Sequence, residues 1–267
     1  MKEMDELVGL EGVKEEISTL VNFIKVQKQR EKAGLQSSTL SYHMVFTGNP
    51  GTGKTTVARI ISRIYKQLGI LDGGHLTETD RSGLIAEYEG QTAVKVNDVV
   101  DAALDGILFI DEAYALNLGH NETYGKEAVA TIIKRMEDDR EKLVVILAGY
   151  TGEMKTFIET NPGFESRINR YINFPDYKPE DLVEIFKRQC AKADYTLTSD
   201  AENKVKDVFA AAYAERDQSF GNARFARNVF ENAMELQSNR LASGRNLSKS
   251  ELCTLIPEDI EAPMSLA

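Results

Sequence analysis

The chain has 267 residues, of which 28% are charged, and its formal net charge at pH 7 is -10. A chain of this length buries roughly three quarters of its unfolded surface, so its core needs neither disulfides nor a structural metal. The negative charge repels nucleic acid phosphates and argues against a DNA or RNA partner, unless a local basic patch exists.

The sequence also indicates the cellular compartment of the protein. Cys190 and Cys253 lie far apart, without the spacing of a metal site, and we interpret them as free thiols of a reducing cytosol. No apolar run approaches the roughly 18 residues that a bilayer span needs, and residues 1–12 lack the apolar stretch of a signal peptide. We therefore expect a cytoplasmic protein without a membrane partner.

Helices and strands alternate in the first part of the chain. Apolar residues at helical spacing predict an amphipathic helix that starts near Val13 and runs to Lys32. The candidate strands are residues 44–47, 75–78, 107–110, 143–147 and 171–174. The first candidate helix between them begins straight after a glycine-rich turn and has its apolar stripe at residues 57–68. The others are residues 92–104, 125–138 and 152–160. Right-handed crossovers of this kind predict a mostly parallel sheet that is covered on both faces.

The pattern changes near Asp176. No further strand pattern appears, and Pro179 opens a helix with an apolar face. Further helices are expected at residues 199–216, at 222–241 and briefly from 257. We therefore predict two domains, an α/β domain over residues 1–176 and an all-helical domain over residues 177–267.

A glycine-rich loop follows the first predicted strand. Residues 48–55 read GNPGTGKT, which is the pattern of a phosphate-binding loop, and they lie between a strand and a helix as that mechanism requires. Glycines let the backbone N–H groups curl around phosphates, and the helix N-terminus adds partial positive charge. Lys54 would bridge the terminal phosphates, and Thr55 would offer its hydroxyl to magnesium. The predicted nucleotide-binding residues of this segment are Gly48, Asn49, Pro50, Gly51, Thr52, Gly53, Lys54, Thr55 and Thr56.

Two carboxylates end the third predicted strand. The apolar run at residues 107–110 is followed by Asp111 and Glu112. Asp111 would organise the magnesium shell and Glu112 would polarise the attacking water, so the pair favours hydrolysis over phosphotransfer. Alone, such a strand end could be a solvated turn, but about 60 residues after a phosphate loop it indicates a catalytic site. The two motifs together predict a P-loop ATPase or GTPase.

Two arginines refine this prediction. Arg167 precedes the fifth candidate strand, where it could reach the nucleotide of a neighbouring subunit. A guanidinium supplied in this way accelerates phosphoryl transfer on the order of a thousandfold or more. Arg224 starts a helix of the second domain, where it could touch the γ-phosphate and couple nucleotide state to domain motion. For both residues, and for Arg170 and Arg227, the alternative is a structural ion pair.

These motifs resemble those of the AAA+ family over nearly the whole chain, and within it the clade of red-type Rubisco activase (CbbX) and stage V sporulation protein K. The segments that carry the resemblance are TGNPGTGKTT at 47–56, ILFIDEAYAL at 107–116, VVILAGY at 144–150, NPGFESRI at 161–168, FPDY at 174–177 and GNAR at 221–224. The resemblance implies a P-loop NTPase with three αβα layers, a parallel sheet of order 5-1-4-3-2 and an all-helical lid. It also implies that ATP and Mg bind at the interface between subunits of a ring, usually a hexamer.

The resemblance assigns roles to further residues. It makes Arg167 the arginine finger, Arg224 sensor 2, and Tyr88 the pore-loop aromatic that grips an extended client chain. Val8 and Leu10 match the apolar wall beside the adenine. Ordinary packing is the alternative for these three apolar or aromatic residues.

The sequence differs from the family pattern at two positions that matter for function. Glu89 follows the pore-loop aromatic where relatives tend to have an apolar residue, which bears on client choice. The strand end at 147–151 lacks the asparagine that many members use as sensor 1, and Tyr150 and Thr151 are the candidate substitutes.

The prediction is therefore an ATP hydrolase that forms a ring and remodels or partly threads a client protein. One alternative is a nucleic-acid motor or loader of the same class, which would need basic residues in its channel. Net charge and Tyr88 argue against it. Another alternative is a nucleotide-gated assembly adaptor with little turnover, and the complete set of Asp111, Glu112, Arg167 and Arg224 argues against that.

Overall fold

Contacts divide the chain into two compact units in the computed structural model, which describes residues 1–36, 41–88, 90–117, 122–244 and 246–262. The first unit contains Met1–Gly48 and Gly53–Phe174, and the second contains Asn49–Thr52 and Pro175–Ala267. The tip of the glycine-rich loop, residues 49–52, thus groups with the C-terminal part of the chain.

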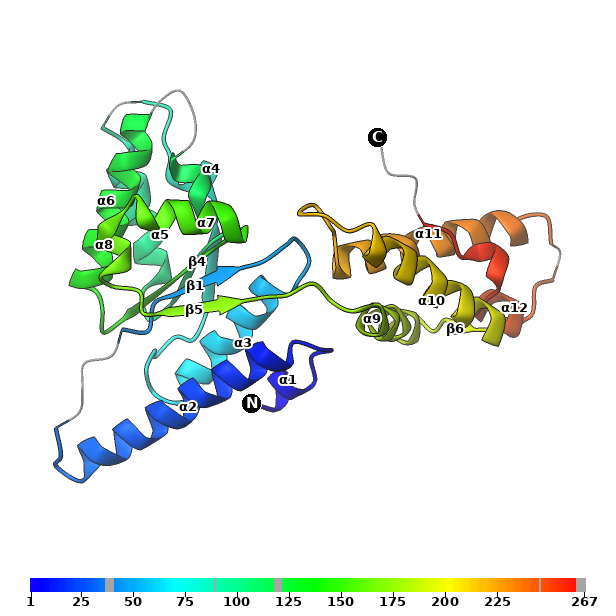
Figure 1. Ribbon diagram of the computed structural model, residues 1–267, viewed down its shortest axis with the longest axis horizontal. Coiled ribbons are helices and arrows are strands. Elements are labelled where there is room, and N and C mark those ends of the chain that lie inside the picture. Colours follow the sequence, from blue (N-terminus) through cyan, green and yellow to red (C-terminus); the bar gives the residue numbers. More distant parts are fainter. Residues whose placement is uncertain (37–40, 89, 118–121, 245, 263–267) are drawn as a thin grey trace. The chain divides into compact units, whose positions relative to one another are not determined.

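A parallel sheet of five strands, in the order β2-β3-β4-β1-β5, forms the centre of the first unit (Figure 1). The strands are β1 (Met44–Thr47), β2 (Leu76–Thr79), β3 (Gly106–Ile110), β4 (Leu143–Gly149) and β5 (Arg170–Asn173). Every residue of β3 and β4 is buried, which explains why these strands are continuous apolar runs rather than alternating ones. The predicted strand order is confirmed.

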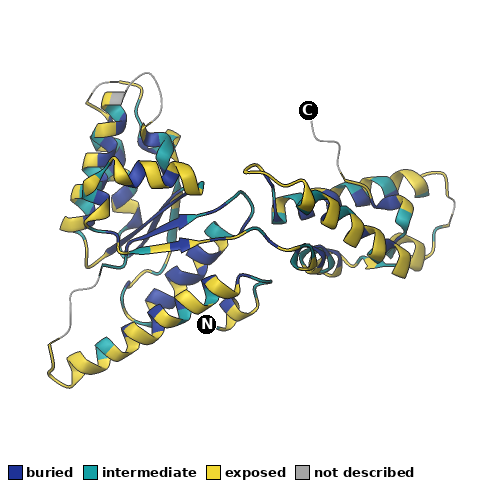
Figure 2. Ribbon diagram, in the orientation of Figure 1, coloured by how far each residue is buried: buried dark blue, intermediate teal, exposed yellow. Residues whose placement is uncertain are grey.

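Helices cover both faces of this sheet. They are α1 (Lys2–Asp5), α2 (Glu11–Lys32), α3 (Lys54–Gln67), α4 (Arg81–Leu84), α5 (Thr92–Ala103), the 3₁₀ turn η1 (Ala113–Asn117), α6 (Glu122–Asp138), α7 (Thr151–Glu159) and α8 (Pro162–Glu165). Helices α1 to α3 lie on one face and α5 to α8 on the other (Figure 1), and their buried sides turn toward the strands (Figure 2). The one-turn elements were not predicted, because a single turn is too short to show apolar periodicity.

The second unit is mainly helical. Its elements are α9 (Pro179–Lys192), β6 (Thr196–Leu197), α10 (Ser199–Ala214), α11 (Ala223–Leu241), α12 (Lys249–Cys253), β7 (Thr254–Leu255) and the 3₁₀ turn η2 (Pro257–Asp259). The expectation of helices alone is wrong in one respect, since β6 and β7 pair in parallel. Two residues per strand are too few for an alternating pattern. In the core of the second unit, the ring of Phe186 makes edge-to-face contacts with the rings of Phe209 and Phe230.

The two cysteines of the second unit are both free. Burial raises the pKa of the Cys190 thiol to about 12, so it stays protonated and unreactive at neutral pH. Over the described part of the chain, every helix is too short or too polar to cross a lipid bilayer.

Candidate functional site

The glycine-rich loop leaves the carboxyl end of β1 and enters α3. Gly48, Gly51 and Gly53 have φ values of 143°, 70° and 95°, a region that side chains disfavour. A Cβ on Gly48 would lie 2.2 Å from the backbone oxygen of Phe174. Gly53 is the N-cap of α3 and brings no side-chain cap. The helix therefore begins with backbone N–H groups that suit an anion.

Polar side chains brace this loop from within. The Nζ of Lys54 donates to the carbonyl of Gly48 at 2.7 Å, so its ammonium lies against the loop. The hydroxyl of Thr52, a fully buried residue, donates to the carbonyl of Asn49 at 2.8 Å. Thr55 is half-buried in the first turn of α3, and Thr56 is exposed. An ammonium, left-handed glycines and an open helix N-terminus together fit a polyphosphate.

The predicted acidic pair follows β3. The N–H of Asp111 donates to the carbonyl of Thr79 at 2.9 Å, and its Oδ1 accepts from the N–H of Glu112 at 3.1 Å. Glu112 is exposed and has a φ of 47°, a conformation that costs a residue other than glycine about 1–3 kcal/mol. Such strain at an exposed carboxylate is typical of functional positions.

The acidic pair and the loop leave the same edge of the sheet. β4 lies between β3 and β1, so their carboxyl ends are two strand spacings, about 10 Å, apart. The described residues contain no group of three or more His, Cys, Asp or Glu side chains able to hold a metal. Magnesium usually takes one or two carboxylates together with substrate phosphates and waters. Asp111, with the hydroxyl of Thr55, fits that mode of binding.

Two tyrosines lie beside the acidic pair. The rings of Tyr114, in η1, and Tyr150, at the end of β4, have centroids 6.0 Å apart. Burial, followed by the charge of Glu112, raises the pKa of Tyr114 to about 12, so its hydroxyl remains protonated at neutral pH. Thr151 is exposed at the start of α7. Sequence reasoning gave Tyr114 no role, although it lies two residues after Glu112.

Arg167 is held within its own chain. Its Nε lies 3.3 Å from Oε2 of Glu137, and its Nη1 donates to the carbonyl of Gly163 at 3.1 Å. The Arg167 side chain is 28% exposed. The ion pair that the sequence left open as an alternative is therefore present. Glu137 was missed because it lies in α6, remote from Arg167 in the chain. Action on a neighbouring subunit remains a prediction.

The predicted aromatic and apolar residues differ in exposure. Tyr88 is 66% exposed, as a gripping residue requires, while Glu89 lies outside the described residues. Leu10 is buried and takes a left-handed conformation with a φ of 61°, and Val8 is half-buried. Val8 thus keeps accessible apolar surface for an adenine, whereas the burial of Leu10 also suits ordinary packing.

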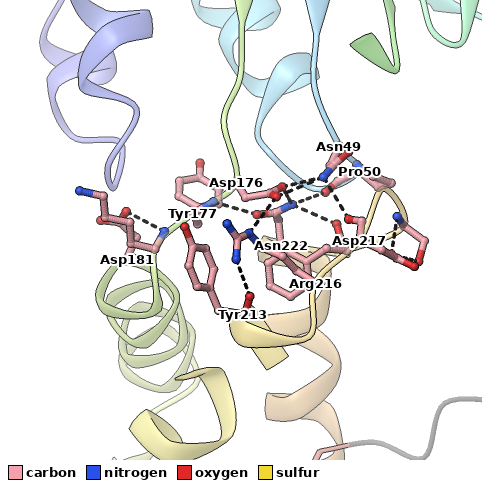
Figure 3. A network of polar contacts seen from close by, with 12 residues as sticks. Asn49, Pro50, Asp176, Tyr177, Asp181, Tyr213, Arg216, Asp217 and Asn222 are labelled. Carbon is pink, nitrogen blue, oxygen red and sulfur yellow. Dashed lines mark hydrogen bonds and ion pairs between the residues drawn. The ribbon is translucent and has the colours of Figure 1, made fainter. Parts of the chain in front are cut away.

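A polar network surrounds the loop tip within the second unit (Figure 3). Asp176 accepts from the side-chain amides of Asn49 and Asn222. Arg224, at the start of α11, is exposed, and the N–H of the preceding Ala223 donates to the carbonyl of Gly51 at 3.2 Å. No role for Asp176 or Asn222 was predicted from sequence, although both lie in segments that carry the family resemblance.

A parallel sheet of this order, with a phosphate loop after β1 and paired carboxylates after β3, defines a P-loop nucleotide-binding protein. Residues 44–176 match the model of the ATPase family associated with various cellular activities (AAA), and residues 178–266 match that of the AAA lid domain. The chain belongs to the AAA family and is an ATP hydrolase.

Curated relatives place the chain within this family. It is 43% identical over 260 residues to stage V sporulation protein K of Bacillus subtilis, an alignment that covers 97% of the chain and 81% of the relative. It is 43% identical over 267 residues to protein CbbX of Cereibacter sphaeroides, covering 98% and 85%. The AAA domain of FIGL-1 shares the fold, with a TM-score of 0.66 at 16% identity, covering 98% of this chain and 84% of that chain. The predicted resemblance to the clade of CbbX and stage V sporulation protein K is confirmed.

Proposed function

We propose that the chain binds Mg-ATP, hydrolyses it in a ring of identical subunits, most simply a hexamer, and uses the cycle to remodel or partly thread a client protein. The observation that carries this proposal is the pairing of a phosphate loop with a strained, exposed Glu112 at one edge of the sheet. A carboxylate in this place can accept a proton from water near a bound γ-phosphate. We place this activity in the cytoplasm.

The proposed roles follow the position of each group. Backbone N–H groups of the loop and Lys54 bind the phosphates, and Thr55 and Asp111 hold magnesium. Glu112 orients the attacking water. Mg-ATP supplies the phosphoanhydride bond that is cleaved.

Arg167 is proposed to complete the site of the adjoining subunit. To do so, it must leave Glu137. A partly exposed pair of this kind, with 28% and 49% of the side chains accessible, is worth about 1 kcal/mol or less. A thousandfold gain in rate corresponds to about 4 kcal/mol. Glu137 also pairs with Arg140 at 3.2 Å, so its charge stays compensated after Arg167 leaves. The pair in the free chain is therefore compatible with action in trans.

The proposed client is a protein. Tyr88 offers an exposed ring in a polar segment, and an aromatic ring grips extended chains with little dependence on sequence. One relative, 42% identical over 260 residues, is named as the chloroplastic ribulose bisphosphate carboxylase/oxygenase activase of Cyanidioschyzon merolae. The net charge of -10 disfavours the nucleic-acid alternative.

The test is the variant Glu112→Gln, with Glu159→Gln as the matched control on an exposed carboxylate of α7. We expect Glu112→Gln to bind ATP with unchanged affinity and to lose at least roughly a hundredfold in turnover, while the control behaves as wild type. Proteins retained by the ATP-bound variant are identified by mass spectrometry. Normal turnover in Glu112→Gln would refute the catalytic assignment, and recovery of nucleic acid alone would refute the protein remodeller.

A further inference from the structure

We propose that Asn222 is a positioning residue that ties the tip of the phosphate loop to the helical unit, so that the loop tip and the start of α11 respond to nucleotide as one element. This inference rests on the proposed function, because it concerns how a bound nucleotide is communicated. It assigns a role to a side chain that contacts no reacting atom.

Asn222 is a fully buried polar hub (Figure 3). Its Nδ2 donates to Oδ1 of Asp176 at 2.7 Å, to the carbonyl of Phe220 at 3.0 Å and to the carbonyl of Pro50 at 3.2 Å. Its Oδ1 accepts from the N–H of Tyr177 at 2.8 Å. One amide thus joins the loop tip, the segment after β5 and the start of α11. A buried amide with partners on three segments fixes their mutual geometry.

The backbone of Asn222 shows that its side chain is needed at this place. Residues 221–224 form a type II′ turn, closed by the N–H of Arg224, which donates to the carbonyl of Gly221 at 2.9 Å. Asn222 occupies the first central position of this turn, with a φ of 50° and a ψ of -123°. Glycine is the residue that this position favours. The side-chain contacts of Asn222, rather than the turn conformation, therefore explain an asparagine at this position.

Asp176 holds the loop tip at a second point. It accepts from Nδ2 of Asn49 at 3.0 and 3.2 Å, and it lies 3.6 Å from Nε of Arg216. The guanidinium of Arg216 stacks on the ring of Tyr213, with 3.7 Å from its carbon to the centroid. The carboxylate is thus held by charge and by hydrogen bonds from both asparagines.

The loop tip has a third attachment at the backbone of α11. The N–H of Ala223 donates to the carbonyl of Gly51 at 3.2 Å, and a Cβ on Gly51 would lie 2.1 Å from the carbonyl oxygen of Gly221. Asn49, Pro50 and Gly51 are therefore each bound by a different group of the second unit. Gly48 and Gly53, on either side of the tip, belong to the first unit. If the loop tip moves when phosphates bind, these hydrogen bonds must transmit the movement to residues 176, 222 and 223.

The test is hydrogen exchange with and without Mg-ADP at saturating concentration, in wild type, Asn222→Gly and the control Asn228→Ala. Asn222→Gly removes the hub but leaves the residue that the turn favours, so we expect the variant to fold. Asn228 lies on the exposed side of the same helix. Exchange is followed separately at residues 48–56 and at residues 217–226, and circular dichroism checks that each variant is folded.

In wild type and in Asn228→Ala, Mg-ADP should slow exchange about tenfold or more in both segments. In Asn222→Gly, protection of the loop should remain, while that of residues 217–226 should fall below about twofold. An equal response of both segments in Asn222→Gly would overturn the inference. Loss of loop protection in that variant would also overturn it, because Asn222 would then support binding itself. No response in wild type would instead refute the proposed nucleotide function.

Discussion

Lowering the pH from 7 to 5 should destabilise the protein through His43, a residue that is 4% exposed. The N–H of Val145 donates to Nδ1 of its ring at 2.9 Å, and its Nε2 lies 3.2 Å from the carbonyl oxygen of Met136. These partners require a neutral ring with its proton on Nε2. If Nδ1 were protonated, its N–H would face the N–H of Val145 in the core, and neither donor would have the other as an acceptor.

The magnitude follows from the pKa values. Burial, with a smaller contribution from the charge of Arg167, lowers the pKa of His43 from 6.5 to about 4. Between these values the unfolded chain binds more protons than the folded one, so stability falls as the pH falls from 6.5 toward 4. Linkage gives a loss of about 2 kcal/mol between pH 7 and pH 5.

The assay is urea unfolding at pH 7 and pH 5, followed by circular dichroism because the chain has no tryptophan. The control is His43→Gln, which has a polar side chain but does not titrate in this range. We expect the variant to be less stable than wild type at pH 7. Its free energy of unfolding should differ much less between pH 7 and pH 5 than that of wild type. An unchanged difference in His43→Gln would refute the assignment to His43.

Three further predictions, two of them with a control variant, test other parts of the structure. Gly48→Ala places a methyl group 2.2 Å from a backbone oxygen and should lower the free energy of unfolding by at least about 2 kcal/mol in urea titrations. Gly152→Ala, where a Cβ meets nothing within 4 Å, should stay within about 0.5 kcal/mol. Arg240→Ala removes the charged partner of Asp259, whose 1% exposed carboxylate still accepts from the N–H of Ile256 at 3.0 Å, and should cost about 3 kcal/mol, read from calorimetric unfolding. Unchanged unfolding of either destabilising variant would contradict its explanation. Tyr88→Ala should keep basal ATP turnover within about twofold but lose client recovery in the hydrolysis-deficient trap, while Tyr88→Phe keeps both; full recovery with alanine would exclude the grip.

Residues close together in the chain could be predicted from sequence, and contacts between distant residues could not. The strand at 44–47 has the predicted bounds, because a buried strand between two loops gives a clear apolar run. The ion pair of Arg167 with Glu137 joins the segment between α8 and β5 to α6, a contact between distant segments that no local pattern encodes.

The role of Asn222 was hidden for a different reason. The segment GNAR predicts a role for Arg224, which lies at the start of a predicted helix of the second domain and could touch the γ-phosphate. The sequence gives no φ value, so the replacement of glycine by asparagine in a type II′ turn was not visible. The Gly-Asn pair at residues 221–222, where the predicted helix begins, was the signal that could have suggested a turn with a positive φ.

The shared active site can be tested directly by mixing two inactive variants, Arg167→Ala and Glu112→Gln, and measuring ATP turnover. Each variant alone should be inactive. In mixed rings, about a quarter of the interfaces would join an intact Glu112 to an intact Arg167, so turnover should recover to about a quarter of wild type. If the variants assemble together and the mixture is no more active than its parts, Arg167 does not act across the interface and the account is contradicted.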